Sequence, residues 1–288
     1  MTAPARSDAP HQPALRTAPR RESLALRMFL AFSPRIRRVT HAEPPASLAP
    51  FEVFSIPRPE GSPLQATWYP TSKPPRGVVL FLHPWVGWGQ TYFHRHGRIE
   101  AVREAGYHAI TVDIMNIGGQ DKRPPQLFDI DVQDALAGAR QRAAGLPVHV
   151  WGVSAGGYWA HMALARDNAL DGVFFEEVAV HLLEWLRRMA PAATPVTLLF
   201  RLIFAEAYRF MDIRHHASSL QAKAIAYVSG DADRSIRVEE TKDLASRAKA
   251  ECSIIAGAAH LEVIKRDSQG VLDLALATFA RAERQSRG

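Results

Sequence analysis

The chain has 288 residues, which is long enough to bury one sizeable core, and a single α/β domain of this length is ordinary. Hydrophobic residues make up 47% and charged residues 22%, a globular composition that excludes a disordered or membrane-spanning chain. The net charge is +6, but residues 1–50 hold eight arginines and three acidic residues, so the rest carries about one net charge. Because a nucleic-acid-binding domain concentrates basic residues on its folded face, no nucleic-acid partner is expected.

The first 50 residues form a basic N-terminal segment. Residues 1–23 are rich in proline, alanine and arginine and are expected to be disordered or loosely attached. The apolar run Leu24–Phe32 is far shorter than the roughly 20 residues that span a bilayer, and Arg27 interrupts it. It is interpreted as a helix packed on the body, as a helix in the plane of a membrane surface, or as neither. A peripheral membrane contact through residues 24–38 therefore stays open.

From residue 51 onward, strand-like and helix-like stretches alternate. Phe51–Pro57 and Leu64–Tyr69 are predicted to form an antiparallel pair. Val78–Leu82 is typical of a strand covered on both faces, and Tyr92–Ala105 is a predicted helix. The other predicted elements are strands His108–Val112, Val148–Trp151, Gly172–Phe175, Ala224–Val228 and Ser253–Ile255, and helices Asp131–Ala144, Ala155–Arg166, Glu239–Ala250 and Val271–Arg284. This alternation predicts a domain over 51–288 of the α/β class, with a doubly wound, mostly parallel sheet.

One interval, about 177–220, breaks the alternation. It is rich in leucine, phenylalanine, tryptophan and arginine, and Pro191 and Pro195 divide it into two predicted helices. An insertion at this point lies above the carboxyl ends of the strands, where ligands bind in parallel sheets. We expect a helical cap over a binding pocket; helices that only pack on the body are the alternative.

A Gly-x-Ser-x-Gly pattern runs from Gly152 to Gly156, between a predicted strand and a predicted helix. A sharp strand-to-helix turn exposes the hydroxyl of Ser154, and the close approach of strand and helix requires small residues two positions away on each side. The backbone N–H of Ala155 stands at a helix start, where it can donate to a developing oxyanion. The pattern predicts a nucleophilic serine at position 154.

With this pattern the chain resembles the α/β-hydrolase family, and the resemblance extends from about residue 51 to the C-terminus. That family orders its catalytic residues as nucleophile, acid and histidine. The acid of the motif falls on Asp233, within the segment Ser229–Ile236, and the histidine falls on His260. The resemblance implies Ser154 as nucleophile, His260 as general base and Asp233 as the acid that orients the base.

Three other carboxylates are alternatives for the acid. Asp231 precedes Asp233 by two residues and is otherwise expected to accept a turn hydrogen bond. Glu176 and Glu177 follow an earlier strand, at a place where some relatives carry the acid.

The loop after Val78–Leu82 is expected to supply a second oxyanion donor. Its sequence, residues 83–87, is similar to the family's His-Gly-x-x-Gly, with Pro84 in place of glycine. Proline has no N–H, so the backbone N–H of Trp85 is the predicted donor. His83 is interpreted as a structural support of this loop.

Other chemistry-bearing residues have ordinary interpretations. His94 and His96, and the pair His215-His216, lack further nearby ligands, so no metal or cofactor is expected. The aromatic residues near the predicted site either pack in the core or line an acyl pocket; they are Trp85, Trp88, Tyr92, Phe93 and Trp159.

The sequence thus predicts a serine hydrolase that cleaves a small-molecule ester or thioester through an acyl-serine. Amide hydrolysis, carbon–carbon bond hydrolysis and acyl transfer use the same residues and stay open. A membrane-surface lipase or lysophospholipase and a non-catalytic binding protein are the two alternatives. Cys252 is the single cysteine, which excludes an intrachain disulfide and favours a cytoplasmic protein, membrane-associated if residues 24–38 bind lipid.

Overall fold

The computed structural model describes residues 43–59, 62–85, 89–114, 128–165 and 170–287. The predicted apolar segment Leu24–Phe32 and Trp88 lie outside these ranges. Among the residues that are described, no helix is both long enough and apolar enough to cross a membrane.

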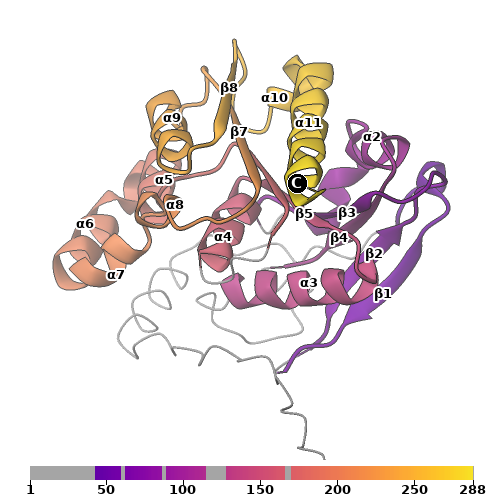
Figure 1. Ribbon diagram of the computed structural model, residues 1–288. Helices are drawn as coiled ribbons and strands as arrows, with labels where there is room; N and C mark the ends of the chain where they lie inside the picture. The colour runs from indigo at the N-terminus through magenta and orange to yellow at the C-terminus, as the bar shows by residue number, and fades with distance from the viewer. Residues whose placement is uncertain (1–42, 60–61, 86–88, 115–127, 166–169, 288) are drawn as a thin grey trace, which may run out of the picture.

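One open sheet of eight strands organises the molecule (Figure 1), in the order β1-β2-β4-β3-β5-β6-β7-β8. The β1–β2 and β2–β4 pairs are antiparallel and all the others are parallel, as the alternation of strands and helices predicts. The strands are β1 Glu52–Ile56, β2 Leu64–Tyr69, β3 Gly77–Leu82, β4 Tyr107–Val112, β5 Val148–Val153, β6 Gly172–Glu176, β7 Ala224–Gly230 and β8 Glu251–Ile255.

The central strands are buried along their whole length because helices cover both faces of the sheet. In β3, Val78, Leu80 and Leu82 face one apolar layer, whereas Val79 and Phe81 face the other. The first layer is completed by α3 (Phe128–Ala143), α4 (Ala155–Leu164) and α9 (Val238–Arg247). The second is completed by α2 (Arg98–Glu104), α10 (Val263–Arg266) and α11 (Ser268–Arg287). The core therefore fixes the carboxyl ends of the parallel strands at one edge, where the loops meet.

Two predictions about the helices are wrong, one about where a helix begins and one about how many helices there are. The predicted helix Tyr92–Ala105 is a 3₁₀ segment, η2 (Gly89–His94), followed by α2, and the break falls at His96 and Gly97, which both have positive φ. The chain between β6 and β7 holds four α-helices and one 3₁₀ turn, where two helices were expected. These elements are α5 Leu182–Met189, η4 Pro191–Ala193, α6 Thr194–Ile203, α7 Ala205–Phe210 and α8 Arg214–Ala217.

The prolines explain only part of this subdivision. Pro195 occupies the first turn of α6, where a missing N–H is tolerated, so it starts a helix there. The break between α6 and α7 comes at Phe204, which has φ −123° and ψ 49°. No glycine or proline marks that position. Helices α5 to α8 lie beside α9 in Figure 1, away from the β1–β2 edge of the sheet.

Candidate active site

Ser154 lies on a tight turn between β5 and α4, with φ 48° and ψ −116°, a backbone conformation that non-glycine residues rarely adopt. Gly152 and Gly156 allow the strand and the helix to approach each other closely at this turn. A Cβ atom at Gly152 would stand 2.7 Å from the Cα of Gly157, and one at Gly156 would overlap the carbonyl oxygens of Leu82 and His83. The Ser154 amide donates to the Glu176 carbonyl at 2.8 Å, which ties the turn to β6. This is the strained strand-to-helix turn that the sequence pattern predicts.

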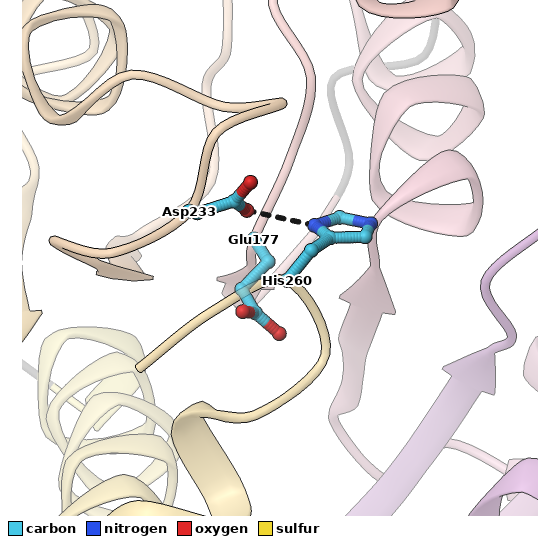
Figure 2. A group of neighbouring side chains, drawn as sticks. All are labelled: Glu177, Asp233 and His260. Atoms are coloured by element: carbon cyan, nitrogen blue, oxygen red, sulfur yellow. Dashed lines mark hydrogen bonds and ion pairs between the residues drawn. The ribbon is translucent and has the colours of Figure 1, made fainter. Parts of the chain in front are cut away.

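The structure brings His260 and Asp233 to this serine from two distant loops. His260 follows β8, and its Nε2 lies 3.0 Å from the Ser154 Oγ. Asp233 follows β7, and its Oδ2 lies 2.8 Å from the His260 Nδ1, the contact drawn as a dashed line in Figure 2. The three side chains form one continuous line of hydrogen bonds, in the order that the resemblance implies.

Asp233 is held in its ionised form. Its second oxygen, Oδ1, accepts hydrogen bonds from the Ser235 amide and hydroxyl, each at 2.7 Å, and from the Ile236 amide at 3.0 Å. Burial raises the pKa of this carboxyl, but the His260 contact, the Ser235 hydroxyl and the Ile236 amide outweigh it, so the pKa lies below its usual value. An ionised Asp233 keeps a proton on Nδ1 of His260, which leaves Nε2 free to accept one from Ser154.

The alternative acids have other partners. Asp231 is exposed and accepts from the Gly257 amide at 2.6 Å, so it joins the two loops that carry Asp233 and His260. Glu176 is fully buried and pairs with Arg98 of α2 at 2.5 Å, and it also accepts from the Trp151 indole at 2.9 Å. Neither is hydrogen-bonded to the imidazole.

Glu177 does lie close to the site. Glu177, Asp233 and His260 each present one ligand-type atom within 4.8 Å of the others, and they are the group of metal-ligand type found among the described residues. The direct Asp233–His260 hydrogen bond uses atoms that a cation would need. The arrangement therefore fits a proton-transfer pair better than a metal centre. From the sequence, Glu177 is predicted only as an alternative acid.

The proposed oxyanion donors come from two segments, the start of α4 and the loop after β3. Ala155 is the first residue of α4, so its amide is at a helix N-terminus. The Trp85 amide shares a peptide unit with the Pro84 carbonyl, which lies 2.6 Å from the His83 Nδ1. The His83 Nε2 accepts from the Ile114 amide at 3.1 Å, so Nδ1 carries the proton and donates to Pro84. Burial lowers the pKa of His83, which keeps the ring neutral.

The same contact orients the peptide between Pro84 and Trp85. The two hydrogen bonds of His83 fix the plane of the Pro84–Trp85 peptide. In a trans peptide the N–H points opposite to the C=O, so His83 also sets the direction of the Trp85 N–H. Residues 86–88 lie outside the described ranges.

Helix α5 lies next to the site. The ring of Trp185 stands 6.3 Å from the His260 ring and 5.9 Å from the Trp85 ring, measured between centroids. Arg188, one turn later, pairs with Glu240 of α9 and donates to the Ser235 carbonyl at 2.9 Å. The helix is thereby tied to the loop that carries Asp233.

The other candidates pack elsewhere. Trp159 and Phe93 are core residues, against Phe128 and Phe81 respectively, and Tyr92 contacts Arg98. His94 contacts the Tyr69 hydroxyl at 2.9 Å. Within the described residues, four of the histidines named above join no group of metal-ligand type: His94, His96, His215 and His216.

Comparison with known proteins places the fold. No family model matches the chain, and no curated protein matches its sequence. An esterase of Pyrococcus furiosus superposes with a TM-score of 0.70 at 16% identity, over 85% of this chain and 96% of that one. Esterase 2 of Thermogutta terrifontis gives 0.60 at 19%, over 82% and 95%. The α/β hydrolase GrgF of Penicillium sp. sh18 gives 0.63 at 16%, over 82% and 99%. At these identities the likeness concerns architecture, and the chain has the α/β-hydrolase fold.

Proposed function

We propose that the protein is a serine hydrolase that cleaves a small-molecule carboxylic ester or thioester through an acyl-serine intermediate. The observation that carries the proposal is the line of hydrogen bonds from Ser154 through His260 to Asp233, placed on a strained strand-to-helix turn. A free serine hydroxyl is a weak nucleophile at neutral pH, and a neighbouring imidazole held by a carboxylate supplies the base it needs. The esterases that share this fold support the same chemistry.

The proposed reaction has two halves. In the first, Ser154 Oγ attacks the acyl carbon while His260 Nε2 takes its proton, and the amides of Ala155 and Trp85 donate to the oxyanion. The imidazolium then gives that proton to the leaving alcohol or thiol, and the acyl group stays on Ser154. In the second half, His260 takes a proton from water, the water oxygen attacks the acyl carbon, and the proton returns to Ser154 as the acid leaves.

A series of p-nitrophenyl esters of increasing acyl length tests this proposal. The wild-type protein should hydrolyse at least one ester, and Ser154→Ala should lower kcat on the order of 10⁴-fold or more while leaving the far- and near-UV circular dichroism unchanged. A wild-type protein without activity on any ester or thioester, or an equally active Ser154→Ala variant, would refute it. The former result would favour a non-catalytic binding protein.

One observation favours a second candidate, a lipase or lysophospholipase that works at a lipid surface. Helix α6 turns an apolar face outward: Leu198, Leu199, Leu202 and Ile203 are each at least half exposed, and Leu202 is 80% exposed. Large contiguous apolar surfaces of this kind are typical of membrane or partner contacts. Residues 24–38, which lie outside the described ranges, are the other proposed contact with lipid.

Co-sedimentation with phosphatidylcholine–phosphatidylglycerol liposomes tests the lipid-surface candidate. The full-length protein, a Leu198→Ser/Leu202→Ser variant and a protein lacking residues 1–42 should be compared, with p-nitrophenyl butyrate hydrolysis as the check of an intact site. Lipid binding that falls in either altered protein supports the candidate. Equal sedimentation of all three, at the level seen without liposomes, would exclude it.

A further inference from the structure

Glu177 is a buried acid that the proposed mechanism does not use. It follows β6 directly, its side chain is 0% exposed, and its backbone has a positive φ of 53°. Its amide donates to the Val228 carbonyl at 2.8 Å, so the residue is held between β6 and β7. Neither carboxyl oxygen makes a hydrogen bond of normal geometry with the described residues. Buried polar groups in native proteins almost always have partners, so this side chain calls for a physical role.

The charges around Glu177 favour its neutral form. Glu176, the last residue of β6, is already paired with Arg98, and Asp233 on the β7–α9 loop is already paired with His260. A third carboxylate would be buried beside two others, without a cation of its own among the described residues. Burial, followed by the charges of Glu176 and Asp233, raises the pKa of Glu177 to about 9. At neutral pH the group is a carboxylic acid.

The carboxyl group lies against the loop that carries the catalytic base. One Glu177 carboxyl oxygen lies within 4.8 Å of a ring nitrogen of His260 and of a carboxyl oxygen of Asp233, without a hydrogen bond to either. Leu261 has a positive φ of 62°, so the chain turns sharply just after His260. Figure 2 shows the Glu177 carboxyl pointing away from the hydrogen bond between Asp233 and His260. The acid therefore lies beside His260 and leaves the imidazole to Asp233.

We propose that Glu177 is a positioning residue for His260: its buried carboxyl group supports the sharp turn at Leu261 and so directs the imidazole Nδ1 toward Asp233. A charged group at this position would compete with Asp233 for the Nδ1 proton, whereas a neutral one does not. The titratable groups that face it are Glu176 with Arg98 and Tyr92, Asp233, His260 and Glu262. The inference rests on the hydrolase function proposed above.

Two variants separate the shape of this side chain from its polarity. Glu177→Gln keeps a neutral group with an acceptor oxygen, so kcat should stay within roughly threefold of the wild type. Glu177→Leu keeps the bulk but removes both polar oxygens beside His260, so kcat should fall on the order of 10²-fold with KM little changed, because the base is misplaced and the substrate contacts are not. Glu239→Gln, at an exposed position of α9, is the matched control and should change neither value.

Spectroscopy gives readouts that do not depend on turnover. The low-field proton resonance of the His260 Nδ1–H should persist in Glu177→Gln and disappear or broaden in Glu177→Leu. The infrared difference between wild type and Glu177→Gln at neutral pH should contain the carbonyl stretch of a protonated carboxylic acid. If Glu177→Leu fails to fold, the Glu177→Gln spectra and kinetics still decide.

Several results would overturn the inference. These are a carboxylate band in place of the acid band, a Glu177→Gln variant that loses the His260 resonance, or a folded Glu177→Leu variant with wild-type kcat. If instead the wild-type protein hydrolyses no ester while the acid band and the His260 resonance are both present, the proposed function fails and the positioning role stands.

Discussion

Replacing Glu177 by glutamine should change how stability depends on pH. In the unfolded chain the carboxyl titrates near its ordinary pKa of 4.5, whereas in the folded protein the pKa is raised to about 9. Because the folded state binds the proton more tightly, its contribution to stability is fully present below pH 4.5 and is lost as pH rises toward 9. Each pH unit above the unfolded pKa corresponds to about 1.4 kcal/mol, and the unfolded carboxyl is already half ionised at pH 4.5, so a rise from pH 4.5 to pH 7 removes about 3 kcal/mol from the wild type. Glutamine does not titrate, so Glu177→Gln should not show this loss.

Urea unfolding followed by tryptophan fluorescence measures the effect. The two proteins should have similar free energies of unfolding near pH 4.5, and the variant should be more stable by about 3 kcal/mol near pH 7. All other titrating groups are common to both proteins, so their difference isolates Glu177, and Glu239→Gln serves as the control for an exposed acid. A difference in stability that does not change with pH would show that Glu177 is ionised in the folded state, and the reasoning about its neutral form would be refuted.

Three further predictions concern the candidate site. Asp233→Asn should lower kcat on the order of 10⁴-fold, whereas Asp231→Asn should mainly lower the unfolding midpoint, because Asp231 only joins two loops; reversed results in ester hydrolysis would move the acid to Asp231. His83→Phe should lower kcat by about 10- to 10³-fold, since the Trp85 N–H loses its orientation, and an unchanged kcat would remove that amide from the oxyanion site. Gly156→Ala should yield little folded protein on expression, because its Cβ would overlap the backbone oxygens of Leu82 and His83 at the carboxyl end of β3; normal yield and activity would contradict the described turn.

The sequence predicted best those features that depend on local patterns. The serine turn is one such case, because small residues on both sides of Ser154 are needed wherever a strand passes sharply into a helix. The parallel strands are another, because burial on both faces requires unbroken apolar runs such as Val78–Leu82. Both features can be deduced from a few adjacent residues.

Other features arise from contacts between distant parts of the chain. Asp231 and Asp233 are nearly equivalent in sequence, and only the folded loops show that one faces Gly257 and the other His260. The position of Glu177 beside the His260 loop depends on how β6 and β8 are placed in the sheet. The break at Phe204 has no local signal, because neither proline nor glycine stands there; the Phe204 side chain packs against the apolar core.

Covalent labelling with a fluorophosphonate probe, followed by intact mass and peptide mapping, tests most directly whether Ser154 is an activated nucleophile. The account predicts one adduct per chain, located on Ser154, absent from Ser154→Ala and formed far more slowly in His260→Ala. A folded wild-type protein that stays unlabelled, or an adduct on another residue that persists in Ser154→Ala, would contradict it.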